Sequence, residues 1–153
     1  MLTVLLIAFA IVGVCAIVHT IGLTFVADWL LDRRTMLRNM GLVGHSVVLI
    51  CVFAVIVLLH ILEAGIWATF YQTWGLFPNF ETSFYFSLTS YTTIGYGDVT
   101  LPQRWRMLGG VEGFSGVLLC GLSTAFIFII LNAMLESRRG RPVAEEVRKA
   151  DGG

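Results

Sequence analysis

The sequence predicts an all-α integral membrane protein, for two reasons. Of its 153 residues, 57% are hydrophobic and only 13% are charged, and the mean hydropathy of +0.84 is far above that of an ordinary soluble domain. Three windows are also long enough to cross a membrane as helices, which takes roughly 20 apolar residues. These windows are Leu2–Ala27, Ser46–Phe70 and Leu108–Leu135.

The first window is interpreted as a retained membrane helix and not as a cleaved signal peptide. Its apolar run is long, no basic residue precedes it, and no small-residue cleavage pattern follows it. It also lacks a ladder of arginines or lysines, so it cannot supply the gating charges of a voltage sensor. We expect it to pack against the second helix.

The basic residues predict how the chain is oriented. Two clusters follow the first and third windows, at 33–38 and 138–149, whereas only Arg104 and Arg106 lie between the second and third windows. The positive-inside rule then places the C-terminus and the loop after the first window in the cytoplasm, and the N-terminus outside.

Residues 78–91, PNFETSFYFSLTSY, are apolar enough to enter a membrane but too short to cross it at about 1.5 Å per residue. They predict a re-entrant half-helix, with Asn79 as its N-cap and Glu81 in its first turn. Non-helical backbone at membrane depth is tolerated only where protein buries it or where it lines a wet cavity. The next stretch, SYTTIGYGDVT at 90–100, is therefore expected to line such a cavity.

The residue types of this stretch suit cation binding by the backbone. Gly95 and Gly97 can adopt a positive φ at no steric cost, which allows neighbouring carbonyls to face one axis. The carbonyls of Thr93, Ile94, Gly95 and Tyr96, with the Thr93 hydroxyl, would then form stacked oxygen rings. A cage without a carboxylate suits a hard monovalent cation that exchanges its water shell for carbonyl dipoles.

The sequence TTIGYGD at 92–98 resembles the selectivity filter of potassium channels. The resemblance covers roughly residues 47–135 and implies the outer helix, pore helix, filter and inner helix of prokaryotic potassium channels. It further implies a homotetramer in the bacterial inner membrane, with K⁺ bound by Thr93, Ile94, Gly95 and Tyr96 and no other cofactor. Gly97 would complete the filter, and Thr92 and Asp98 would support it.

Other residues gain expected roles from the same resemblance. Tyr85 and Phe86 occupy the positions of a tryptophan pair in the family and would brace Tyr96 from behind. Thr89 lies four residues before Thr93, where some relatives carry a residue that tunes inactivation. Gly116 resembles the hinge glycine of bacterial inner helices; alternatively, it allows close helix packing, as small residues do in membranes.

Ionisable residues inside the windows are functional candidates because they are costly there. His60 and Glu63 share a helix face and could form a pH-sensitive pair, although structural anchoring also explains them. No third histidine or cysteine lies near them at ligand spacing, which disfavours a zinc site. Glu112 is expected to steady the pore helix, and His19 to snorkel or to form an interhelical hydrogen bond.

The chain thus divides into an N-terminal helix with its linker (1–45), a pore domain (46–135) and a short basic tail (136–153). The tail is expected to contact anionic lipid headgroups rather than nucleic acid. The predicted function is passive, potassium-selective conduction and not catalysis, because no catalytic constellation lies at membrane depth. Two alternatives remain: a weakly selective monovalent cation channel, which Tyr96 disfavours, and a pore-loop unit of a potassium-uptake transporter.

Overall fold

The computed structural model describes the backbone of residues 2–150 and the side chains of residues 2–37 and 39–136. Every regular element in this range is a helix, which confirms the predicted all-α class. The elements are α1 (Leu2–Asp32), α2 (Arg34–Asn39), α3 (Leu42–Thr73), α4 (Phe80–Tyr91), η1 (Gln103–Trp105) and α5 (Arg106–Ala150). Three helical stretches are long and apolar enough to span a membrane: Leu2–Asp32, Leu42–Thr73 and Gln103–Glu136.

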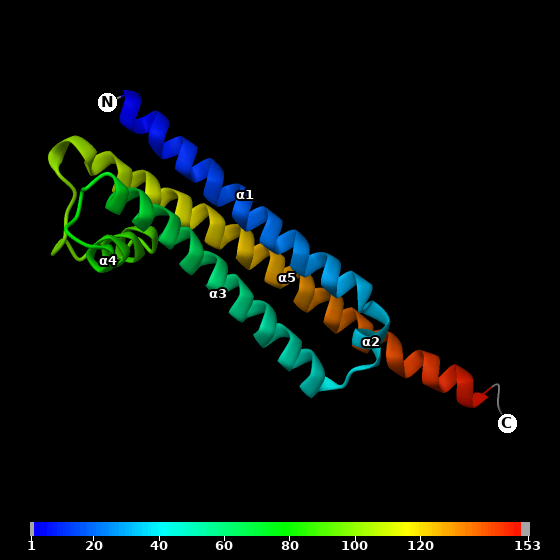
Figure 1. Cartoon of the computed structure of the whole chain (residues 1–153). Helices are drawn as coiled ribbons and strands as arrows, with labels where there is room; N and C mark the ends of the chain where they lie inside the picture. The colour runs from blue at the N-terminus through cyan, green and yellow to red at the C-terminus, as the bar shows by residue number, and fades with distance from the viewer. Residues whose placement is uncertain (1, 151–153) are drawn as a thin grey trace.

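The three long helices form an elongated bundle (Figure 1). The N-terminus and α4 lie at one end of this bundle, and α2 connects α1 to α3 at the other end. The chain continues beyond the α2 end as the last part of α5. The exposed faces of the long helices are mostly apolar, as expected of helices that meet lipid.

α1 packs against both α3 and α5. The expected contact with α3 is present, but the contact with α5 was not predicted from the sequence. The buried residues of α1 recur at helical spacing along one face: Val4, Ala8, Cys15, His19, Leu23 and Val26. This stripe lies in both hydrophobic clusters of the bundle, so α1 is an integral part of its core.

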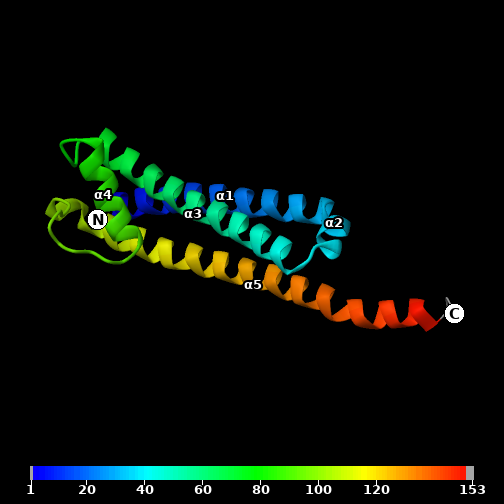
Figure 2. The ribbon, with the colours of Figure 1, turned by 90° about the horizontal axis from the view of Figure 1, so that it is seen from below.

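α4 begins and ends close to where the sequence predicts. The side chain of Asn79 caps the helix by accepting a 2.8 Å hydrogen bond from the backbone N–H of Thr82, and Glu81 lies in the first turn. The helix lies steeply across the bundle, between the ends of α3 and α5 (Figure 2). Phe86 secures it there, since its ring lies 5.3 Å from Tyr71 and 5.0 Å from Phe77, centroid to centroid.

Two glycines of α5 allow α4 to approach closely. A Cβ at Gly113 would lie 2.8 Å from the carbonyl oxygen of Ser90, and a Cβ at Gly116 would overlap the carbonyl oxygen of Tyr91. These carbonyls belong to the last turn of α4. Close packing against α4 is therefore enough to explain a glycine at position 116. α5 continues through this residue as a helix. Its role as a gating hinge stays a prediction.

We expect Gly116→Ala to destabilise the protein by about 1–3 kcal/mol, because the added methyl group must push the end of α4 away from α5. Gly121→Ala is the matched control: Gly121 also lies in α5, but nothing lies within 4 Å of its added Cβ. The control should be neutral or gain up to about 1 kcal/mol from helix propensity. Thermal denaturation of the purified variants measures both effects, and equal stability of the two would contradict the packing assignment.

Candidate functional site

The backbone of the TTIGYGD segment, which follows α4, alternates in conformation. Thr93, Gly95 and Gly97 have φ angles of 60°, 53° and 79°, which lie in the left-handed region. This region costs a glycine nothing but disfavours threonine, so Thr93 is held in a strained conformation. Alternation between left-handed residues and their neighbours can turn successive peptide groups toward the same side. The positive φ predicted for Gly95 and Gly97 is therefore present, and Thr93 shares it.

Hydrogen bonds tie the start of this segment to α4. The backbone N–H of Thr93 donates to the carbonyl of Ser90 at 2.9 Å, and that of Gly95 donates to the carbonyl of Thr89 at 3.0 Å. The hydroxyl of Thr92 donates to the carbonyl of Leu88 at 2.6 Å. Thr89 therefore supports the segment through its backbone carbonyl, whereas its hydroxyl donates to the backbone carbonyl of Phe86 within α4.

The two aromatic residues predicted to brace Tyr96 have other partners in the structure. The Tyr85 hydroxyl donates a 2.7 Å hydrogen bond to Asp98, and the carboxylate of Asp98 raises the pKa of Tyr85. Phe86 is buried in the aromatic cluster with Tyr71 and Phe77. Tyr96 itself is 70% exposed on a single chain. The bracing of Tyr96 stays a prediction, while the Tyr85–Asp98 bond gives Asp98 a supporting role at the end of the segment.

Behind the segment, Glu112 connects three helices. Its side chain is fully buried on α5 and accepts hydrogen bonds from Tyr71 of α3 at 2.7 Å and from Ser87 of α4 at 2.5 Å. A buried carboxyl group needs such partners, because burying it without hydrogen bonds is costly. Glu112 thus steadies α4 as the sequence analysis expected.

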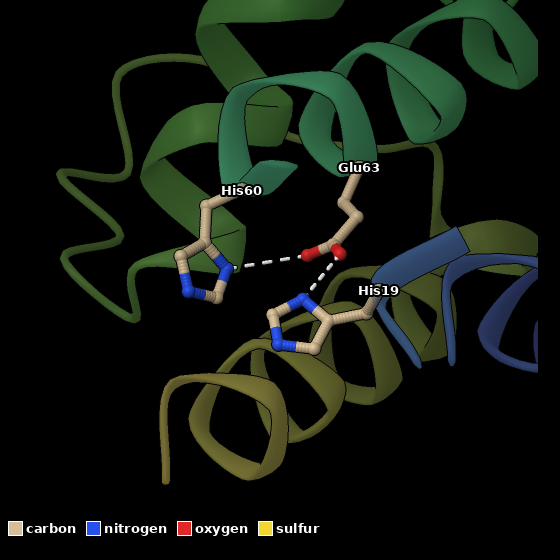
Figure 3. A group of neighbouring side chains, drawn as sticks. All are labelled: His19, His60 and Glu63. Atoms are coloured by element: carbon tan, nitrogen blue, oxygen red, sulfur yellow. Dashed lines mark hydrogen bonds and ion pairs between the residues drawn. The ribbon is translucent and has the colours of Figure 1, made fainter. Parts of the chain in front are cut away.

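A second polar cluster, formed by His19, His60, Glu63, Tyr91 and Ser123, lies one turn further along α4. The carboxylate of Glu63 is fully buried, and its two oxygens lie 2.7 Å from His19 Nδ1 and 3.2 Å from His60 Nδ1 (Figure 3). Tyr91, the last residue of α4, donates its hydroxyl hydrogen bond to the same carboxylate. The Ser123 hydroxyl of α5 lies 3.0 Å from His19 Nε2 and 3.2 Å from His60 Nε2.

The sequence leaves two roles open for His19. His19 is fully buried, so the snorkelling alternative was wrong and the interhelical hydrogen bond was right. His19 also brings a third possible ligand atom from a different helix to within 4.8 Å of those of His60 and Glu63, which spacing along the sequence could not show. The presence of an ionisable residue in an apolar window indicates that His19 needs a polar partner, but nothing in the sequence identifies that partner.

Comparison with protein families places these features in context. A family model described as an ion channel matches residues 46–133, more than half of the chain. The chain belongs to this ion channel family. Comparison with curated proteins and with solved structures gives no significant match. The matched range includes nearly all of α3, α4, the TTIGYGD segment and most of the apolar part of α5, so this ion channel is an integral membrane protein.

We expect Tyr71→Phe to destabilise the channel by about 1–3 kcal/mol, because one oxygen of the buried Glu112 loses its donor where water cannot replace it. Tyr85→Phe is the control, since it removes an exposed hydroxyl bond to Asp98 that water can replace. The difference is measured as the shift in denaturation midpoint of the purified proteins. Equal shifts for the two variants would show that Glu112 does not depend on Tyr71.

Proposed function

We propose that this ion channel is a homotetramer that conducts K⁺ selectively and passively. The observation that carries the proposal is the left-handed backbone at Thr93, Gly95 and Gly97 within the sequence TTIGYGD. Carbonyl oxygens of residues 93–96 would replace the hydration shell of K⁺, with the Thr93 hydroxyl at one end and Gly97 at the other. No covalent step is involved.

The exposure of the segment supports assembly around a central axis. Ile94 and Tyr96 are 55% and 70% exposed on one chain, although both are large and apolar or aromatic. One chain also supplies only one wall of a carbonyl cage, so several copies are needed to surround an ion. Neighbouring copies would cover Ile94 and Tyr96 and close the cage.

The proposed orientation follows from the basic residues, with the filter end outside and the C-terminus in the cytoplasm of a bacterial inner membrane. Arg33 and Arg34, at the α2 end of the bundle, would then meet anionic headgroups. The basic residues of the tail, proposed to do the same, lie outside the described side chains.

Reversal potentials of the purified protein in liposomes, measured with K⁺ on one side and Na⁺ on the other, test the proposal. We expect the reversal potential to follow the K⁺ gradient closely, because a carbonyl cage compensates K⁺ for its lost water better than Na⁺. A reversal potential near zero in equal concentrations of the two ions would favour the weakly selective cation channel. The uptake-unit alternative predicts no conduction by this chain alone.

We expect Gly95→Ala to abolish K⁺ flux, because an added Cβ opposes the φ of 53° that orients the neighbouring carbonyls. Gly75→Ala is the matched control: Gly75 has a φ of 65° but lies in the turn after α3, and nothing lies within 4 Å of the added Cβ at either glycine. The control should lose some stability but keep its selectivity. Flux assays on the assembled variants separate the two, and near wild-type flux through Gly95→Ala would rule out the filter assignment.

A further inference from the structure

We propose that His19, His60 and Glu63 form a binding site for a divalent transition-metal ion of the Zn²⁺ class. Their nitrogen and oxygen ligand atoms all lie within 4.8 Å of one another, although they come from two helices (Figure 3). Imidazole nitrogens and a carboxylate oxygen are ligands that Zn²⁺ takes in proteins. The site lies outside the TTIGYGD segment and does not depend on its selectivity.

Glu63 is fully buried, and its ion-pair partners among the described residues are the two histidines. A buried carboxylate is costly unless it is paired with a cation or coordinates a metal. Neutral imidazoles and the Tyr91 hydroxyl provide hydrogen bonds but no full positive charge. A cation bound by these ligand atoms would compensate the buried charge of Glu63.

The hydrogens available to the two imidazoles favour the same ligand set. Both rings direct Nδ1 toward Glu63 and Nε2 toward the Ser123 hydroxyl, and His60 Nε2 also lies 3.8 Å from Cys120 Sγ. If both rings are neutral and donate from Nδ1, the two Nε2 atoms share the single hydrogen of Ser123, with only the weak S–H donor of Cys120 as a second source. If a metal occupies the lone pairs of both Nδ1 atoms, each Nε2 carries a hydrogen and both can donate to Ser123 Oγ.

This arrangement also matches how proteins orient metal-bound histidines, which donate their second N–H to an oxygen acceptor. Ser123 would serve both histidines as such an acceptor and is assigned as a positioning residue.

Binding a metal requires the side chains to adjust around one ion. Ligand atoms around a tetrahedral zinc with bonds of about 2.0–2.1 Å are separated by about 3.3 Å. Here His19 Nδ1 lies 2.7 Å from Glu63 Oε1 and His60 Nδ1 lies 3.2 Å from Glu63 Oε2, and the ligand atoms of the three residues lie within 4.8 Å of one another. His60 is the one residue of the three whose side chain is partly exposed, at 18%. Water or the Tyr91 hydroxyl would take the fourth position.

The full-length protein, purified in detergent and stripped of metal with a chelator, is titrated with ZnCl₂ by calorimetry and with CoCl₂ by visible absorption. We expect about one ion per chain and the absorption bands of tetrahedral Co²⁺. His19→Gln and His60→Gln should lose this binding, and Ser123→Ala should weaken it by about 10–100-fold. His45→Gln is the control, because His45 lies elsewhere on α3 and bonds the carbonyl of Leu37; it should bind like the wild type.

Thermal denaturation establishes which variants are folded, and the conservative Ser123→Ala keeps the test valid if His19→Gln does not fold. The proposal is overturned if the wild type binds no stoichiometric Zn²⁺ or Co²⁺, or if the folded cluster variants bind as tightly as His45→Gln. It is also overturned if NMR titration finds one imidazole of the cluster doubly protonated while added metal leaves its resonances unchanged. That result would make the cluster a proton site, which is the pH-sensitive alternative for His60 and Glu63.

Discussion

Inside a membrane, a backbone that leaves the helical conformation must be covered by protein or face a water-filled cavity. The chain comes under this constraint at the C-terminal end of α4, where Thr92 ends the helix and the left-handed Thr93 follows directly. Gly113 and Gly116 allow α5 to cover the last carbonyls of α4 at contact distance. Hydrogen bonds that Thr92, Thr93 and Gly95 donate to backbone carbonyls of α4 then fix the position at which the chain leaves the helix.

Two buried carboxylates hold α4 in this position. Glu112 on α5 accepts the hydroxyl hydrogen bond of Ser87, and Glu63 on α3 accepts that of Tyr91 one turn further along α4. Each carboxylate also bonds to a residue of another long helix: Tyr71 of α3 for Glu112, and His19 of α1 for Glu63. The short helix α4 is thus fixed by hydrogen bonds to two buried carboxyl groups as well as by the packing of Phe86.

The sequence predicts the helices and the backbone conformation of the segment well, because both depend on local signals. Apolar length locates the three long helices, Asn79 marks the start of α4, and the glycines at 95 and 97 indicate positive φ. Contacts between helices are harder to predict from the sequence. The sequence does not identify the partner of His19, and it offers close packing at Gly116 only as one of two explanations, because both contacts depend on how the helices rotate and cross. Phe86 shows the same limit: its type predicted aromatic packing, but not with Tyr71 and Phe77.

α1 lies outside the range matched by the ion channel family, yet it is bound to the part of the structure that supports the TTIGYGD segment. His19 contacts Glu63 of α3 and Ser123 of α5, so it joins both long helices of the matched range at the level where Tyr91 ends α4. Removing α1 would expose the buried carboxylate of Glu63 to lipid and take away one of its two imidazole partners. The first helix is therefore connected to the end of α4 through the polar contact of His19 with Glu63, and not through its apolar surface alone.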